Sequence, residues 1–339
     1  MYSFDSTGLF QASERQAGAS GGALAAAVTS GGGFGFLAAG YDGAQKLKNE
    51  LEMARSALQL HSSAPIPIGV GYLSWQLEKA NSPAIELLSL ALEARVKAVW
   101  FAFGSDLGRW VEFVRNHDGK SRDGHKTLVF AQISTTEEAQ QAISEWRVDV
   151  VVAQGIESGG HGHGSAPPLL ALVPSIIANS PPDGPPLLAA GGLSHGAHVA
   201  SLLTLGAAGA VLGTRFLLTP ESLYTAAQKQ ALLAASDSAT VRTLAFDRAR
   251  GTLEWPSGVD GRALYNDTVI DDDNGVSIDE VKKKFLDGVT KGDAHRMLVW
   301  AGTGVGLMTS VKDAKAVVEE LHQEIVERLT ASAALVGDS

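Results

Sequence analysis

Residues 187–216 read LLAAGGLSHGAHVASLLTLGAAGAVLGTRF, and this stretch contains two apolar runs that each carry glycine at or near the end. The runs, Leu187–Ala190 and Ala210–Thr214, are rich in Leu, Ala and Val, as parallel strands buried on both faces are. Between them, Ser194 is a suitable N-cap for a segment with helical spacing. A buried strand, a helix and a second buried strand form the βαβ unit of α/β proteins.

The same alternation extends back along the chain to about residue 33, in a repeat of ~30 residues. An eighth strand is expected near Leu9–Ala12, before a helix around Ala23–Val28, although the polar Ser13-Glu14-Arg15-Gln16 stands where a barrel strand would end. Seven apolar runs are predicted to be strands: Phe34–Ala39, Ile66–Tyr72, Ala98–Phe103, Thr127–Gln132, Asp149–Gln154, Leu187–Ala190 and Ala210–Thr214.

Two arrangements use this alternation, a closed (β/α)₈ barrel and an open doubly wound sheet. The glycine-rich turns cluster after the late strands rather than after the first, which favours the barrel. We therefore predict an α/β fold in which residues 1–219 form a (β/α)₈ TIM barrel. Residues 220–339 are predicted to be a mainly helical appendage that packs on the barrel and covers part of the site. Within it, Trp255–Asn274 is rich in Asp, Gly and Asn and is expected to be a loop.

Composition excludes several classes of function. The chain of 339 residues is 45% apolar and carries a net charge of −10, which argues against nucleic acid or an anionic membrane surface as a partner. It has no cysteine, so a disulfide scaffold, a thiolate zinc site and a cysteine nucleophile are excluded together. No apolar run approaches a membrane span and no signal peptide is apparent, so a cytoplasmic location is expected. The oligomeric state stays open.

The glycines that follow the two late strands predict a phosphate site. Backbone N–H groups at a turn from strand to helix, together with the helix dipole, favour a bound anion. Gly191-Gly192 and Gly213-Thr214 stand at two consecutive turns of this kind. In barrels, the loops after strands seven and eight commonly hold a phosphate. A glycine at one such turn is ordinary turn geometry, but two consecutive turns favour phosphate binding.

Residues 150–164 read VVVAQGIESGGHGHG, a buried strand followed by a loop of glycines and histidines. Glycines let the backbone approach a flat ligand closely, and a histidine there can serve as an acid or base near neutral pH. One alternative is a flexible surface loop whose histidines have no chemical role. A metal site at His161 and His163 is a further alternative, but the loop offers no third ligand, and we predict no metal.

These motifs, with WAGTGVGL at residues 300–307, resemble the nitronate monooxygenase family, also called 2-nitropropane dioxygenases, and its enoyl-reductase and quinone-reductase relatives. The resemblance covers about residues 17–220 and implies an FMN-dependent enzyme with a (β/α)₈ barrel and a helical second domain. It implies that His161 lies beside the flavin and acts as the catalytic base. The residues that it implies for cofactor binding are Gly191, Gly192, Gly213 and Thr214 at the phosphate, and Gln154 and Gly160 along the flavin.

The chain departs from the family pattern at the ring end of the flavin. Relatives usually have Ala-Pro-Met at the end of the first strand, whereas here Glu14-Arg15-Gln16 precedes Ala17-Gly18-Ala19-Ser20. Many relatives have Gly-Val-Asn where this chain has Gly69-Val70-Gly71, so an amide that could bond the ring is missing. Changed substrate choice, weakened catalysis and an error in the gene model at the N-terminus are each compatible with this pattern.

The expected activity is therefore FMN-dependent oxidative denitrification of alkyl nitronates and nitroalkanes to carbonyl compounds and nitrite, with dioxygen as the oxidant. The partners are a small-molecule substrate and dioxygen, not nucleic acid or a membrane. The absence of cysteine removes an IMP dehydrogenase-like enzyme, which needs a thiol nucleophile. One alternative is an NAD(P)H-dependent flavin reductase acting on quinones or enoyl thioesters. Another is a flavin-binding protein with weakened catalysis. The physiological substrate is not determined by the sequence.

Overall fold

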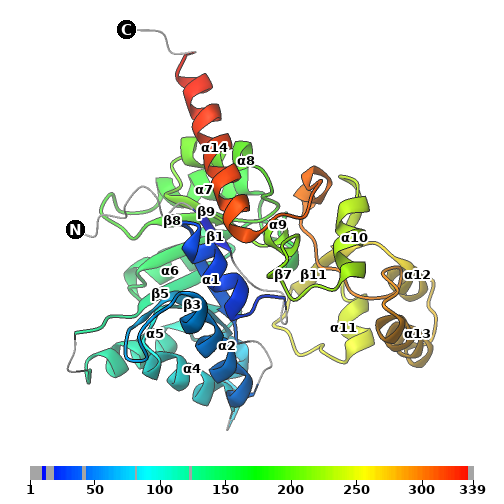
Figure 1. Cartoon of the computed structure of the whole chain (residues 1–339), viewed down its shortest axis with the longest axis horizontal. Coiled ribbons are helices and arrows are strands. Elements are labelled where there is room, and N and C mark those ends of the chain that lie inside the picture. The colour runs from blue at the N-terminus through cyan, green and yellow to red at the C-terminus, as the bar shows by residue number, and fades with distance from the viewer. Residues whose placement is uncertain (1–9, 13–18, 40–42, 81, 122–123, 335–339) are drawn as a thin grey trace.

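The computed structural model describes residues 10–12, 19–39, 43–80, 82–121 and 124–334. Parallel strands close into a barrel in the order β1-β2-β3-β4-β5-β6-β8-β9, which confirms the predicted (β/α)₈ barrel (Figure 1). The short β1 closes the ring by pairing with both β2 and β9. The polar Ser13–Gln16 lies outside the described residues. The barrel strands are β1 (Phe10–Ala12), β2 (Phe34–Ala38), β3 (Ile66–Leu73), β4 (Val96–Ala102), β5 (Leu128–Ile133), β6 (Val150–Gln154), β8 (Leu187–Ala190) and β9 (Gly209–Leu212).

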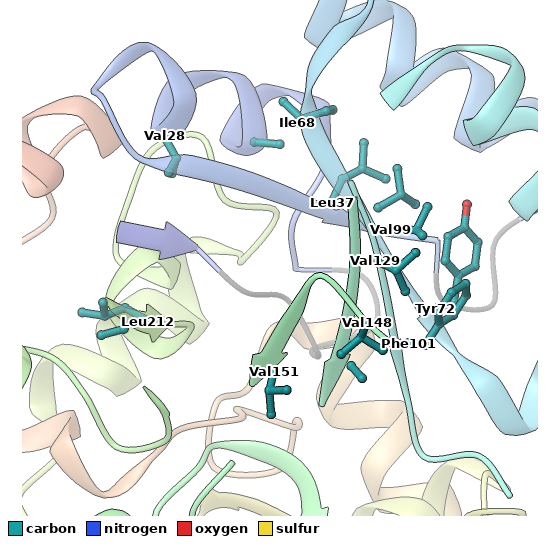
Figure 2. Packing of buried hydrophobic residues seen from close by; sticks show 14 of the residues in the cluster. Val28, Leu37, Ile68, Tyr72, Val99, Phe101, Val129, Val148, Val151 and Leu212 are labelled. Carbon is teal, nitrogen blue, oxygen red and sulfur yellow. The ribbon is translucent and has the colours of Figure 1, made fainter. Parts of the chain in front are cut away.

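Successive side chains of each strand point to opposite faces, so the barrel has an inner and an outer apolar layer. In the outer layer, Leu37 and neighbouring aliphatic side chains pack between strands and helices (Figure 2). In the inner layer, Phe36 makes edge contacts with Trp100 and Phe130 at centroid distances of 5.2 Å. A Cβ at Gly69 would overlap the Phe36 ring, so β3 needs glycine there. The inner layer supports the strand ends that carry the site.

Helices surround the strands, and several begin at a residue whose side chain caps the first turn. The helix Gly196–Thr204 is capped by His195 and not by the expected Ser194. Asp106 accepts a hydrogen bond from the Arg109 amide at the start of α5, and Thr135 caps α6 through the Glu138 amide. The barrel helices are α1 (Gly22–Ser30), α2 (Ala44–Ala57), α3 (Ser74–Leu77), α4 (Ala84–Glu93), α5 (Leu107–Asp118), α6 (Thr136–Ser144), α7 (Leu169–Ala178), α8 (Gly196–Thr204) and α9 (Thr214–Leu217).

The last helix, α14 (Ala314–Ala333), packs against α8 and α1 on the barrel wall (Figure 1). Val317 and Leu321 are buried in the same apolar layer as the barrel helices. Burial of one such side chain contributes about 1.5–3 kcal/mol, so this face fixes the chain end to the barrel. The division of the chain at residue 219 stays a prediction.

Residues 220–313 form a second group of elements beside the mouth of the barrel (Figure 1). It contains four α-helices and one 3₁₀ helix, and it contributes two strands to an antiparallel sheet of order β10-β11-β7. No helix in the described part of the chain is long and apolar enough to cross a membrane. The elements are α10 (Ala226–Ala234), β10 (Thr240–Thr243), α11 (Ala245–Arg250), β11 (Val259–Leu264), α12 (Asp267–Asp273), α13 (Ile278–Lys291) and the 3₁₀ helix η1 (Thr303–Leu307).

The sheet corrects two sequence-based expectations. The predicted loop Trp255–Asn274 contains β11 and α12, and the glycine-histidine loop contains β7 (Gly160–His163). In the sheet, His161 pairs with Gly261 and His163 pairs with Val259. The local composition of both segments is typical of turns. They become strands by pairing with segments that are far away in the chain, and such pairing leaves no signal in the local sequence.

Candidate active site

A cavity lies at the carboxyl ends of β5, β6, β8 and β9, where a barrel carries its functional loops. Its lining combines polar side chains with glycine backbone. We call this cavity the cradle. It is lined by Gln132, Gln154, Ser158, Gly159, Ala190, Gly191, Gly192, Leu193, Val211, Gly213 and Thr214.

The glycine pair after β8 is required by its conformation and by its neighbours. Gly191 has a φ of +135° and Gly192 a φ of +66°, values that L-residues rarely adopt. A Cβ at Gly191 would lie 3.2 Å from the Gly155 carbonyl oxygen and from the Ser158 amide nitrogen. A Cβ at Gly192 would lie 2.5 Å from Thr303 Oγ1. Both positions therefore require glycine, because a side chain there would be strained and would clash with the neighbouring loops.

The WAGTGVGL segment closes over these loops. The Gly302 amide donates to Thr214 Oγ1 at 3.0 Å, and the Thr303 amide donates to the Glu157 carbonyl at 3.1 Å. A Cβ at Gly304 would overlap the Gly192 carbonyl oxygen. The Thr214 hydroxyl accepts from Gly302 and keeps its own proton for another acceptor. The glycines of this motif thus permit backbone to pack directly on the cradle.

Two glutamines and a serine form the polar side of the cradle. Gln132 Nε2 donates to Gln154 Oε1 at 2.5 Å, and Gln154 Nε2 donates to the His161 carbonyl at 3.2 Å. Ser158 is 4% exposed, and its hydroxyl has no hydrogen-bond partner among the described residues. A buried hydroxyl that is unsatisfied costs free energy, so this one points to a ligand.

His161 lies beside the cradle on β7, and the residue is buried with 3% exposure. Its Nε2 lies 3.0 Å and 3.1 Å from the two carboxylate oxygens of Asp247, a residue of α11. The ring stacks on Trp255 at a centroid distance of 3.7 Å and meets the edge of Trp300 at 4.8 Å. A Cβ at the facing Gly261 would overlap the Trp300 ring, so glycine there lets the indole reach the histidine.

Burial controls the charge of this histidine. It is the largest influence and lowers the pKa of His161 below the ordinary value of 6.5. The Asp247 carboxylate raises the pKa, while the positive charges of Arg250 and Arg242 lower it further. The net direction is downward, so the imidazole is neutral at pH 7 and is able to accept a proton.

Two arginines hold the segment that carries His161. The Arg242 guanidinium donates to the Gly162 carbonyl at 2.6 Å and forms an ion pair with Asp260. The Arg262 guanidinium donates to the Ile156 carbonyl at 3.2 Å. Both arginines stand on the strands β10 and β11, so the second group of elements orders the barrel loop.

The structure brings together most of the residues singled out in the sequence. Five of them line the cradle, whereas Gly160 and His161 lie next to it on β7 and connect to it through Gln154. His163 is partly buried and lines a neighbouring cavity with Gln132 and Phe103. The five in the cradle are Gln154, Gly191, Gly192, Gly213 and Thr214.

Sequence reasoning missed three residues at this site. Asp247 is completely buried against His161, but no motif surrounds it and 86 positions separate the two. Trp255 was placed in a loop, although a tryptophan in an Asp- and Gly-rich stretch is a signal of a buried anchor. Ser158 stands inside the recognised run of residues 150–164, but a serine in a loop is not a signal by itself, so only its burial and missing partner identify it.

Comparison with known proteins places the chain in a family. The sequence model described as nitronate monooxygenase matches residues 10–324. The chain belongs to the nitronate monooxygenase family. It is 35% identical to the nitronate monooxygenase npaC of Metarhizium robertsii, over 91% of this chain and 88% of the relative. It is 32% identical to the nitronate monooxygenase of Neurospora crassa, over 91% and 86% of the two chains. The predicted family is confirmed.

Solved structures agree with this assignment. The nitroalkane oxidase of Streptomyces ansochromogenes superposes with a TM-score of 0.76 at 28% identity, over 96% of this chain and 97% of the other. FabK of Thermotoga maritima has a TM-score of 0.76 at 22% identity, over 97% and 96%, and shares the fold. As a member of the nitronate monooxygenase family, the protein is a flavin-dependent oxidoreductase that acts on small molecules.

Proposed function

We propose that this nitronate monooxygenase family member uses FMN and dioxygen to convert alkyl nitronates, and nitroalkanes that it first deprotonates, to carbonyl compounds and nitrite. The observation that carries the proposal is a buried His161 whose backbone carbonyl accepts a hydrogen bond from Gln154, a residue of the glycine-lined cradle. The cradle offers backbone donors for an anion, and the histidine offers a base for a carbon acid.

The residues of the cradle fit FMN. Gly191 and Gly192 line the cradle without side chains, and Ser158 leaves a buried hydroxyl unsatisfied. Backbone amides of Gly191, Gly192 and Gly213, with the Thr214 hydroxyl, would hold the phosphate. Gln154 and Ser158 would contact the remainder of the cofactor. The sequence has no adenosine-binding fingerprint, which favours FMN over FAD.

When bound, the flavin supplies the acceptor for electrons from the nitronate and passes them on to dioxygen. The chain itself supplies the proton transfer that precedes this. His161 takes a proton from the carbon next to the nitro group, the C–H bond breaks, and its electron pair stays on the substrate as the nitronate. An imidazole can do this only when it is neutral, and burial favours the neutral form of His161 by lowering its pKa. A nitronate that arrives as the anion does not need this step.

The test is nitrite release from ethyl nitronate under air by the purified protein, with the released cofactor identified by mass. We expect FMN, and nitrite in proportion to the nitronate consumed. Release of FAD, or a protein that binds no flavin after FMN is added, would overturn the cofactor assignment. Bleaching of the flavin by anaerobic NADPH, combined with no nitrite from the nitronate, would overturn the activity in favour of a nicotinamide-dependent reductase.

A further inference from the structure

The buried Asp247 lies where it can determine which nitrogen of His161 is the base. We propose that Asp247 is a positioning residue that keeps the proton of the neutral imidazole on Nε2 and leaves Nδ1 to take the substrate proton. The proposal rests on the function proposed above. It comes from the contact of Nε2 with both carboxylate oxygens at 3.0 and 3.1 Å, in a site where Asp247 is 0% exposed.

The assignment of the tautomer follows from hydrogen-bonding capacity. A carboxylate only accepts hydrogen bonds, so the ring nitrogen that faces it must carry a hydrogen. A neutral imidazole has one N–H and one lone pair, and the lone pair is therefore on Nδ1. Among the described residues, Nδ1 of His161 has no hydrogen-bond partner, so no protein donor competes for that lone pair.

The carboxylate is itself held in place by the end of its own helix. Thr252 Oγ1 donates to Asp247 Oδ1 at 2.8 Å, and the Thr252 amide donates to the Asp247 carbonyl at 2.9 Å. Gly251, with a φ of +71°, ends α11 and turns Thr252 back toward Asp247. The carboxylate therefore has a fixed partner other than His161, and its orientation does not depend on the histidine alone.

Aromatic rings and the carboxylate restrict different motions of the histidine. Stacking on Trp255, with an interplanar angle of 14°, fixes the plane of the ring but is compatible with a flip within that plane. The contact with Asp247 selects one of the two flipped orientations, because only one places an N–H at the carboxylate. When a proton arrives on Nδ1, the same carboxylate stabilises the imidazolium, as its upward effect on the His161 pKa indicates.

The experiment measures the tautomer and the reaction separately, on the FMN-loaded protein. Histidine labelled with ¹⁵N reports which ring nitrogen carries the proton, and His161→Asn identifies the His161 signals by their loss. The spectrum is recorded at a pH about one unit or more above the ordinary histidine pKa, where a histidine is neutral. In the unmodified protein we expect the proton on Nε2. A proton on Nδ1 would overturn the proposal without any variant having to fold.

The matching kinetic arm uses Asp247→Asn, which keeps the size of the side chain and removes the charge. We expect nitroethane oxidation to fall on the order of 10- to 100-fold, as for other residues that orient a functional histidine. Ethyl nitronate oxidation should fall less than about threefold, because its proton has already gone. The acid limb of the nitroethane profile should move to lower pH, since the carboxylate no longer raises the His161 pKa. A purely structural role would not move this limb.

Two further variants separate positioning from loss of charge. Thr252→Val keeps the carboxylate and should keep the Nε2 proton, with nitroethane activity within about tenfold of the original. Asp273→Asn removes an exposed charge on α12 and should leave the oxidation rates of nitroethane and ethyl nitronate unchanged. Equal losses on both substrates in Asp247→Asn, or an unchanged nitroethane rate, would overturn the role of Asp247. Inactivity of the unmodified protein on both substrates would overturn the proposed function. The ¹⁵N measurement of the His161 tautomer would still test the role of Asp247, because it does not depend on activity.

Discussion

The cradle and the pair of His161 and Asp247, here called the His161 pair, are two parts of one site, but they are built in different ways. The cradle is formed by turns of the barrel, and the end that we propose to hold the phosphate is contained in one stretch of the sequence, residues 187–216. The His161 pair joins a barrel loop to α11 across 86 positions and is held by a sheet whose strands come from both parts of the chain. Binding is therefore local in the sequence, whereas the proposed proton transfer depends on long-range packing.

The largest expected effect on the cradle comes from Gly213→Asp. Gly213 has a φ of −96° and a ψ of −70°, so its backbone accepts an L-residue and the barrel should stay folded. A carboxylate about 4 Å from the phosphate costs about 4 kcal/mol at an effective dielectric of 20, or roughly 1,000-fold in FMN affinity. Titration of the flavin-free protein with FMN measures this loss.

Gly43→Asp is the matched control for that variant. Gly43 precedes α2, has a φ of −83°, and has open space around a would-be Cβ. FMN affinity should stay unchanged in Gly43→Asp. If Gly213→Asp were folded and bound FMN as tightly as this control, the phosphate would have to be held elsewhere.

The pH dependence should separate the two parts of the site. Burial lowers the His161 pKa below 6.5, and only the neutral ring is a base. The kcat/KM for nitroethane should therefore be level above pH 6.5 and fall about tenfold per pH unit below the lowered pKa. FMN affinity should not fall over the same acidic pH range. A limb that begins well above pH 6.5, or one that persists in His161→Asn, would show that another group controls the rate.

The smallest expected effect concerns Ser158 in the cradle. Ser158→Ala removes the hydroxyl that has no partner among the described residues, at almost constant volume. If the hydroxyl bonds the cofactor, its loss should weaken FMN binding by about 0.5–1.5 kcal/mol, or roughly 2- to 12-fold. The temperature of unfolding without FMN should stay the same or rise, because an unsatisfied buried group has been removed. Unchanged FMN affinity would assign the hydroxyl no role in binding.

Most of the barrel could be predicted from the sequence because its strands are continuous apolar runs at a regular spacing. The strands β7 and β11 could not, because Gly160–His163 and Val259–Leu264 are short, glycine-containing segments that are ordered by pairing with each other and, for β11, with β10. The pairing replaces local propensity with backbone hydrogen bonds between distant segments. A tertiary contact of this kind leaves no periodic pattern to recognise.

The candidate site likewise has residues that could be predicted from the sequence and residues that could not. The glycines of the cradle could be predicted because a positive φ at Gly191 and Gly192 and close backbone approach require that residue type. Asp247 could not, since an aspartate in a short helix is an ordinary surface residue until the fold buries it against a histidine. His161 was predicted from its motif, but its neutral charge depends on Trp255 and on burial that only the structure reveals.

The contrast between the cradle, which binds, and the His161 pair, which transfers a proton, depends on one claim. The claim is that His161 acts as a base rather than as a structural residue. Its most direct test is the ratio of nitroethane to ethyl nitronate oxidation in His161→Asn, with His163→Asn as the matched control. Positioned base catalysis contributes on the order of 100- to 10,000-fold, so nitroethane oxidation should fall by that range. Ethyl nitronate oxidation and FMN binding should change little, and His163→Asn should lose little with either substrate. Equal losses on the two substrates in His161→Asn would contradict the account.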